Sequence, residues 1–194
     1  MTRTQIAAAL AALSLAAPAA AGEAWSLDGA SSSMGFVTIK NGDTAESHSF
    51  SDLSGSVADD GTVEVTIPLA SVETLIDIRN ERMREFLFNV AATPEAVVAA
   101  TIDMDALSDL GMGERRAQEV EVTLKTNGTE ADYYADVVVT RVGENAVAVS
   151  TSKPMIADAR DLGYEGGVAK LQELAGLDAI SPAVPVTFDL MFTR

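Results

Sequence analysis

The side chains that could take part in chemistry are few and stand far apart in the sequence. His48 is the one histidine and the chain has no cysteine, so a thiolate zinc site and a cysteine nucleophile are both excluded. No H-E-x-x-H or G-x-S-x-G pattern is present. The paired carboxylates of Asp59 and Asp60 fall in a turn, where we interpret them as hydrated, and we interpret His48 as an exposed strand residue. The sequence therefore predicts no catalytic residue, no metal site, no cofactor and no enzymatic activity.

The overall charge excludes one large class of partner. The chain has 194 residues, with 13 Lys and Arg against 29 Asp and Glu, and a formal net charge of −16. Such an acidic surface repels phosphate backbones, which argues against nucleic acid binding driven by counterion release. With 47% hydrophobic and 22% charged residues, the composition is that of a globular protein of one domain.

The N-terminal residues have the features of a secretory signal peptide. An uncharged apolar run over residues 6–17 follows Arg3, and residues 18–21 (Pro-Ala-Ala-Ala) fit the small-residue cleavage rule. The run is shorter than the roughly 20 apolar residues that span a bilayer. We therefore expect a signal peptide over residues 1–21, one domain over residues 22–194, periplasmic localisation and no stable membrane anchor.

The rest of the chain alternates between apolar and polar residues with a period of two, as strands with one buried face do. Residues 62–69 and 184–192 show the pattern most clearly, with apolar residues at every second position. Turn signals such as Asn127-Gly128 separate the alternating segments. The predicted strands cover residues 24–28, 34–40, 46–56, 62–69, 96–104, 119–124, 130–142, 145–153 and 184–192.

Two segments break the alternation and have the spacing of short helices. They cover residues 79–87 and residues 168–175, and the second ends at a glycine. Many short strands joined by tight turns predict an all-β fold. Because closure removes exposed strand edges, we expect an extended antiparallel β-barrel of about eight strands with two short helical insertions.

One stretch of the sequence is more specific than this pattern. Residues 71–74 (Ser-Val-Glu-Thr), 78–84 (Ile-Arg-Asn-Glu-Arg-Met-Arg) and 86–90 (Phe-Leu-Phe-Asn-Val) precede a proline. This series resembles the signature of the YceI-like family of periplasmic isoprenoid-binding proteins, which typically has an S-x-x-T turn, an R-D-x-x-L helix start and F-F-D-V before a proline. Two departures stand out: Asn80 is at a position where Asp is usual, and Arg82 is at one where His is common.

The resemblance implies a lipocalin-like barrel that binds, transports or sequesters an isoprenoid lipid of quinone or polyprenyl type in an apolar cavity. A barrel of about eight strands is wide enough for one small ligand, although the pattern leaves a packed interior open. Alternation and helix spacing direct nine apolar residues inward as candidate cavity residues: Phe36, Val65, Ile67, Phe86, Phe88, Val122, Leu124, Phe188 and Leu190.

Two other functions and the oligomeric state stay open at this point. The alternative function is a ligand-free barrel that acts as a periplasmic protein–protein interaction module or a stress-related structural module. A hydrolase or isomerase that uses carboxylates in the cavity is disfavoured, because no nucleophile and base occur together. The sequence is compatible with a homodimer as well as with a monomer.

A cationic cluster beside the signature is the candidate site for a lipid head group. Arg79 and Arg82 lie three residues apart, on neighbouring turns of the predicted helix. Glu81 and Glu85 lie among the arginines, so the alternative interpretation is a solvated helix face held by ion pairs at i,i+3 and i,i+4 spacing. Because the net charge disfavours a diphosphate, we expect a neutral head group, such as a quinone, to be preferred.

Overall fold

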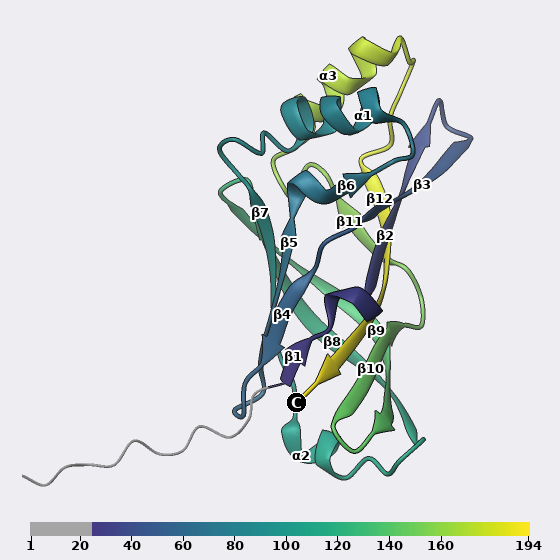
Figure 1. The fold of residues 1–194 in the computed structure, drawn as a ribbon. Coiled ribbons are helices and arrows are strands. Elements are labelled where there is room, and N and C mark those ends of the chain that lie inside the picture. The colour runs from purple at the N-terminus through teal and green to yellow at the C-terminus, as the bar shows by residue number, and fades with distance from the viewer. Residues whose placement is uncertain (1–24) are drawn as a thin grey trace, which may run out of the picture.

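The computed structural model describes residues 25–194, which form mainly antiparallel strands (Figure 1). The predicted signal peptide over residues 1–21 lies outside the described residues. The strands are β1 (Trp25–Leu27), β2 (Ser33–Lys40), β3 (Thr44–Phe50), β4 (Ser54–Val57), β5 (Thr62–Pro68), β6 (Val72–Glu73), β7 (Glu95–Thr101), β8 (Arg115–Thr126), β9 (Thr129–Gly143), β10 (Ala146–Thr151), β11 (Met155–Asp158) and β12 (Ala183–Thr193). The helices are α1 (Asp77–Arg82), α2 (Met104–Ser108) and α3 (Glu165–Ala175), with 3-10 turns at Gly29–Ser31 and Leu69–Ser71 and a π-helical segment at Met83–Leu87 that continues α1.

Eight strands close into a barrel. They pair antiparallel in the order β1, β4, β5, β7, β8, β9, β10 and β12, and β12 then pairs with β1. Strand β12 changes neighbours along its length, because it pairs with β10 and β1 near its C-terminal end and with β11 and β2 towards Ala183. Strands β3 and β6 extend the sheet beyond β2. The predicted antiparallel barrel of about eight strands is confirmed.

The longest hairpin shows how a turn sets the register of two strands. Strands β8 and β9 are joined at Thr126 and Thr129, which lie opposite each other. The two residues between them, Asn127 and Gly128, have φ angles of 50° and 72°. Tight hairpin turns need this left-handed backbone, and Asn-Gly adopts it readily. The turn therefore fixes which side chains of β8 and β9 face the interior.

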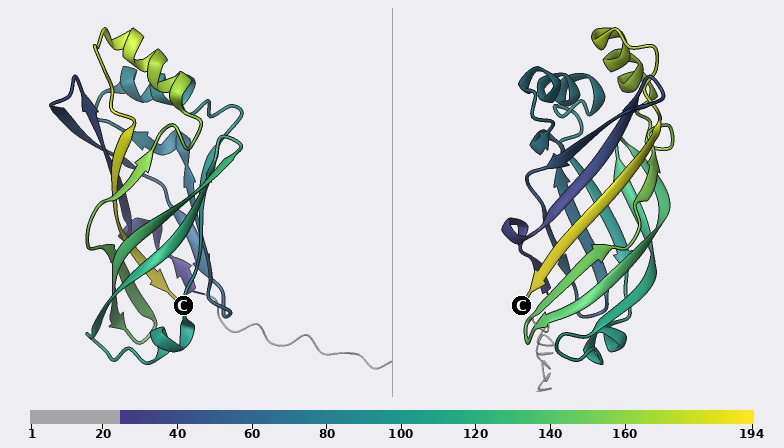
Figure 2. Two further views of the ribbon diagram at one scale, coloured as in Figure 1. Left: turned by 180° about the vertical axis from the view of Figure 1, so that it is seen from behind. Right: turned by 90° about the vertical axis from the view of Figure 1, so that its right-hand side faces the viewer.

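Helices cover the two ends of the barrel. Helices α1 and α3 lie side by side at one end and α2 lies at the other (Figures 1 and 2). Gly167 of α3 packs so closely on the π-helical segment that a Cβ there would lie 2.7 Å from the carbonyl oxygen of Phe86 and 2.8 Å from Cα of Leu87. Any larger residue would push the two helical segments apart, so this contact requires glycine.

The structure corrects the sequence prediction in three places. Helix α2 is a third helix, where the sequence predicts that a strand continues to Met104. The Asp103 side chain caps it by accepting hydrogen bonds from the backbone N–H groups of Asp105 and Ala106, at 3.0 and 3.2 Å. The strand predicted over residues 46–56 is divided into β3 and β4. The short strands β6 and β11 were not predicted, because two to four residues carry too little alternation.

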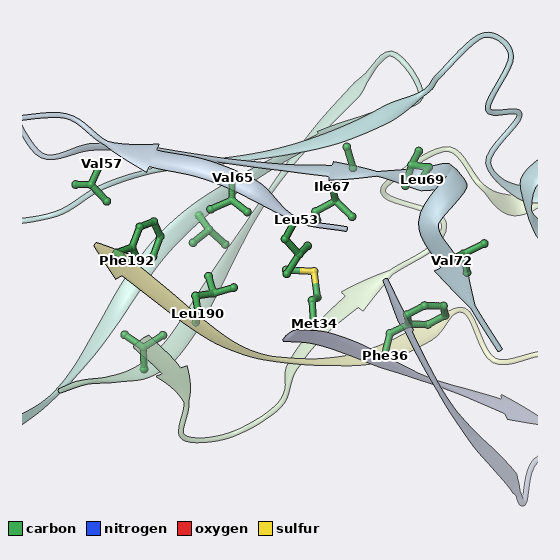
Figure 3. Packing of buried hydrophobic residues seen from close by; sticks show 14 of the residues in the cluster. Met34, Phe36, Leu53, Val57, Val65, Ile67, Leu69, Val72, Leu190 and Phe192 are labelled. Carbon is green, nitrogen blue, oxygen red and sulfur yellow. The ribbon is translucent and has the colours of Figure 1, made fainter. Parts of the chain in front are cut away.

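The buried apolar side chains of the barrel face one another across its interior. Val65 and Ile67 of β5 are buried on one side, and Leu190 and Phe192 of β12 are buried on the other (Figure 3). Strands β5 and β12 are not neighbours in the sheet. The side chains on the inner faces of β5 and β12 therefore face each other across the interior of the barrel.

Candidate ligand-binding site

The barrel encloses a cavity of about 580 Å³. Ile78 of α1 and Leu171 of α3 line it at one end, and Leu107 of α2 lines it at the other, so it runs between the helical ends. Most of the lining side chains are aliphatic or aromatic. Its volume falls within the roughly 300–1,000 Å³ that is typical of small-molecule sites. The inward side chains thus leave room for a ligand.

Eight of the nine apolar residues that the sequence directs inward line this cavity. They are Phe36, Val65, Ile67, Phe88, Val122, Leu124, Phe188 and Leu190. Phe86 does not line the cavity and is half-buried outside it. Met83 and Leu87 take its place in the wall.

The π-helical segment explains why Phe86 is displaced. In an α-helix Met83, Phe86 and Leu87 would share one face. Here the N–H of Phe88 donates a hydrogen bond to the carbonyl of Met83 at 2.9 Å, which spaces the turn by five residues. This wider turn brings Phe88 beneath Met83 and rotates Phe86 away from the interior.

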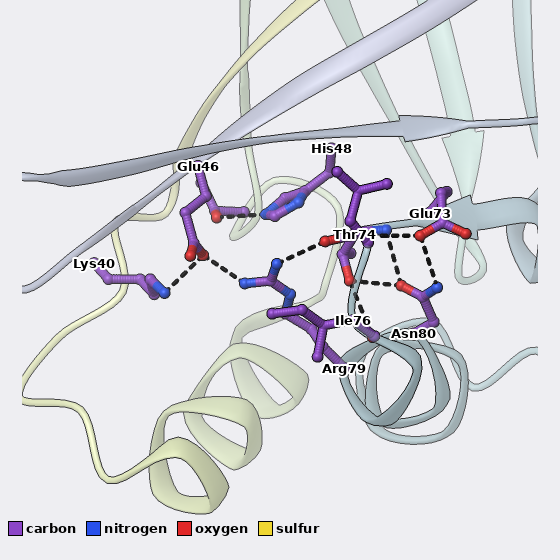
Figure 4. Close-up of polar contacts among 10 residues, drawn as sticks. Lys40, Glu46, His48, Glu73, Thr74, Ile76, Arg79 and Asn80 are labelled. Atoms are coloured by element: carbon purple, nitrogen blue, oxygen red, sulfur yellow. Dashed lines mark hydrogen bonds and ion pairs between the residues drawn. The ribbon is translucent and has the colours of Figure 1, made fainter.

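A cluster of charged side chains lies at the α1 end of the cavity. The carboxylate of Glu46 contacts the Nζ of Lys40 at 2.6 Å and the Nη1 of Arg79 at 2.5 Å (Figure 4). The hydrogen bond from Lys40 and the positive charge of Arg79 lower the pKa of Glu46 below its ordinary value. All three residues line the cavity, so a charged cluster faces the cavity at its α1 end.

His48 is buried beside this cluster, which corrects the interpretation of an exposed strand residue. It is 3% exposed, its Nε2 lies 2.9 Å from the hydroxyl of Thr38, and its ring centroid lies 5.2 Å from that of Phe36. Its Nδ1 has no hydrogen-bond partner among residues 25–194. Burial lowers the pKa of His48, and the positive charges of Arg79 and Lys40 lower it further against the opposing effect of Glu46.

A signal for this burial was present in the sequence. His48 and Phe50 are two residues apart on β3, so they share one face of the strand. The serines between and before them, Ser47 and Ser49, take the opposite face. Because the apolar Phe50 is expected to face the interior, the alternation of the strand also directs His48 inward.

The lowered pKa predicts that His48 makes the folded protein less stable in mild acid. The folded state favours the neutral ring, so below the ordinary pKa of 6.5 the unfolded state binds more protons and the free energy of unfolding falls. The loss cannot exceed about 1.4 kcal/mol per pH unit for one group. Urea denaturation at pH 7.5 and 5.5 should show a larger loss for the parent than for a His48→Gln variant. Equal losses in both proteins would contradict the assignment.

The two candidate head-group arginines both line the cavity, but their partners differ from the sequence interpretation. Arg79 binds Glu46 of β3 and donates from Nη2 to the carbonyl of Thr74 at 2.8 Å. Arg82 donates to the carbonyl of Leu174 in α3 at 3.4 Å. Within residues 25–194 neither arginine forms the ion pair with Glu81 or Glu85 that helix spacing suggested, because the guanidinium groups turn towards the barrel.

Asn80 anchors α1 to the strand before it. Its Oδ1 accepts hydrogen bonds from the backbone N–H and the hydroxyl of Thr74, at 2.9 and 2.6 Å, and its Nδ2 donates to Glu73 at 3.1 Å (Figure 4). Asn80 and Thr74 are both buried. A carboxylate at position 80 would face the carboxylate of Glu73, so the amide suits this chain where the family signature usually has Asp.

Neither a metal-binding cluster nor a membrane-spanning helix occurs among residues 25–194. Across residues 25–194 no three or more His, Asp or Glu side chains gather closely enough to hold a metal ion. None of the helices formed by these residues is long and apolar enough to cross a bilayer.

A match to a family model shows which protein family the chain belongs to. A family model described as the YceI-like domain matches residues 25–192, nearly the whole of the barrel. The chain belongs to the YceI-like family. The resemblance noted at residues 71–90 is therefore confirmed, and its two departures, Asn80 and Arg82, are features of this YceI-like chain.

Solved structures share the fold of this YceI-like protein. One is described as a polyisoprenoid-binding domain from Saccharophagus degradans implicated in plant cell wall breakdown. Its sequence is 35% identical to this chain and its TM-score is 0.85, and the match covers 88% of this chain and 98% of that one. BcnA from Burkholderia cenocepacia is 17% identical with a TM-score of 0.66, over 85% and 98% of the two chains, and shares the fold. No curated protein matches the sequence.

Proposed function

We propose that this YceI-like protein binds an isoprenoid lipid in its barrel cavity and transports or sequesters it without catalysis. The observation that supports the proposal most directly is the cavity of about 580 Å³, which is lined mostly by aliphatic and aromatic side chains and has the Lys40–Glu46–Arg79 cluster at its α1 end. A prenyl chain gains about 0.8 kcal/mol for each CH₂ group moved from water into such a space. The relative that is 35% identical and described as polyisoprenoid-binding supports the same ligand class.

Native mass spectrometry of the protein purified from its own cells tests this proposal. We expect an added mass that organic extraction releases as an isoprenoid. A protein without added mass that also fails to take up an isoprenoid quinone from detergent would overturn lipid binding. That result would favour the ligand-free interaction module instead.

We expect a neutral head group, such as a quinone, to bind in preference to a diphosphate. Arg79 already pairs with Glu46, and the net charge of −16 repels anions, although salt at about 0.15 M confines that repulsion to roughly 8 Å. Competition between a quinone and a diphosphate of equal chain length, at low and physiological salt, measures the preference. A diphosphate that wins at both, and loses its advantage after Arg79→Ala and Arg82→Ala, would contradict it.

We further propose that the protein works in the periplasm after removal of residues 1–21. The N-terminal sequence of the exported protein should begin at or near Gly22. Because the chain has no cysteine, a version that starts there should also fold in the reducing cytoplasm. An exported protein that keeps Met1 would contradict the cleavage.

A further inference from the structure

Three apolar side chains lie exposed where β6 leads into α1. Leu75, Ile76 and Ile78 are 90%, 46% and 52% exposed, and we call these three residues the apolar rim. The other large apolar residues that are exposed within residues 25–194 stand singly along the chain. Single exposed apolar residues are common on protein surfaces, whereas a contiguous group marks a contact site.

The apolar rim is continuous with the cavity. Ile76 and Ile78 line the cavity and are also exposed to solvent, so the cavity opens between them and the neighbouring elements. Leu75 precedes them in the chain and does not line the cavity. An apolar path therefore leads from the barrel interior over Ile76 and Ile78 to the surface at Leu75.

The backbone holds Leu75 outward. Its φ angle of 61° is in the left-handed region, which is strained for a leucine because its Cβ crowds the backbone there. Its N–H donates a hydrogen bond to the Glu73 side chain, which stabilises this turn. The exposed leucine is thus maintained by a strained and hydrogen-bonded conformation.

We propose that the apolar rim contacts a lipid bilayer while the ligand enters or leaves the cavity. The proposal rests on the function proposed above, the binding of an isoprenoid. A prenyl chain that left the cavity into water would expose its whole apolar surface, which is unfavourable. A rim in contact with a bilayer lets the chain pass directly between two apolar environments.

The size and charge of the rim favour a bilayer over a protein and a neutral bilayer over an anionic one. A stable dimer needs about 20–30 residues on each side, far more than three side chains supply, whereas binding to a bilayer surface scales with the apolar area buried and has no such minimum number of residues. Glu73 and Asp77 flank the rim and the chain carries −16. Arg79 beside the rim is already paired with Glu46, so the negative charges dominate and repel anionic lipids, and the occupant is a zwitterionic surface.

Transfer of a radiolabelled isoprenoid quinone from the loaded protein to phosphatidylcholine vesicles tests the proposal. Contact with the bilayer predicts a rate that rises in proportion to vesicle concentration. Leu75→Asn removes the apolar side chain and keeps the left-handed backbone, which asparagine tolerates. We expect this variant to retain parental quinone occupancy by native mass spectrometry and to transfer at least five-fold more slowly.

A matched variant tests whether slower transfer is specific to the apolar rim or follows the loss of any exposed apolar side chain. Met112 is 59% exposed at the α2 end of the barrel, and Met112→Asn should transfer at the parental rate. A rate independent of vesicle concentration, an unchanged rate in Leu75→Asn, or an equal loss in Met112→Asn would each overturn the bilayer contact while leaving lipid binding intact. A parent protein that carries no added mass and also takes up no quinone from detergent would overturn both proposals.

Discussion

A protein carrying Leu124→Trp and Ala100→Trp is expected to lose at least ten-fold of its lipid occupancy while its melting temperature changes by only a few degrees. Both residues line the cavity from neighbouring strands, β8 and β7. Both are half-buried although they face inward, so their accessible surface faces the cavity. Two indole rings there occupy space that the prenyl chain needs. Ile67 also lines the cavity but is only 5% exposed, so the same change there would overpack its neighbours as well.

Occupancy is measured by native mass spectrometry and stability by thermal unfolding. The matched control is Lys125→Trp, which adds the same side chain to the exposed face of β8, one residue from Leu124. The control should bind as the parent does. If the double variant binds as well as the parent but unfolds at a much lower temperature, the two positions belong to a packed core and the cavity assignment fails.

Replacing Asn80 by leucine is expected to lower the free energy of unfolding by about 2–5 kcal/mol. Asn80 is 4% exposed and accepts two hydrogen bonds from Thr74. In the variant the buried N–H of Thr74 has no acceptor, which costs about 1–3 kcal/mol, and the Thr74 hydroxyl keeps only its longer hydrogen bond to the carbonyl of Ile76 at 3.3 Å. Urea denaturation at pH 7 measures the loss, and a change below about 1 kcal/mol would show that this network does not hold α1 in place.

Asn80→Asp separates the hydrogen bonds from the charge. Its side chain keeps an acceptor for Thr74 but places a second carboxylate where Nδ2 now donates to Glu73 at 3.1 Å. Two carboxylates so close raise the pKa of one of them above its unfolded value. The deficit relative to the parent should therefore be largest at pH 7 and shrink as the pH falls towards 5. Adding Glu73→Gln should restore stability at pH 7, because the amide then donates to the new carboxylate.

Much of the fold followed from local patterns. Period-two alternation predicted most strands of the barrel, because a strand with one buried face shows this alternation in its own residues. The Asn127-Gly128 turn was identified for the same reason, since its conformation depends on two residues. Eight inward residues were placed in this way. Phe86 was misplaced, because a π-helical turn differs from an α-helix by one hydrogen bond that no local pattern in residues 79–87 reveals.

The features that define the candidate site depended on contacts between distant residues. Glu46 pairs with Arg79, 33 positions along the chain, and it is the barrel that brings β3 against α1. His48 is buried against Phe36 and Thr38 of the neighbouring strand β2, although its neighbours in the sequence are polar. Whether inward side chains fill a barrel or line a cavity is set by how far apart its walls stand, and that separation follows from strand number and tilt. The sequence by itself determined most of the strands, the turns and most of the inward faces, whereas the cavity, the charged cluster at its α1 end and its apolar rim were decided only when the sheet closed.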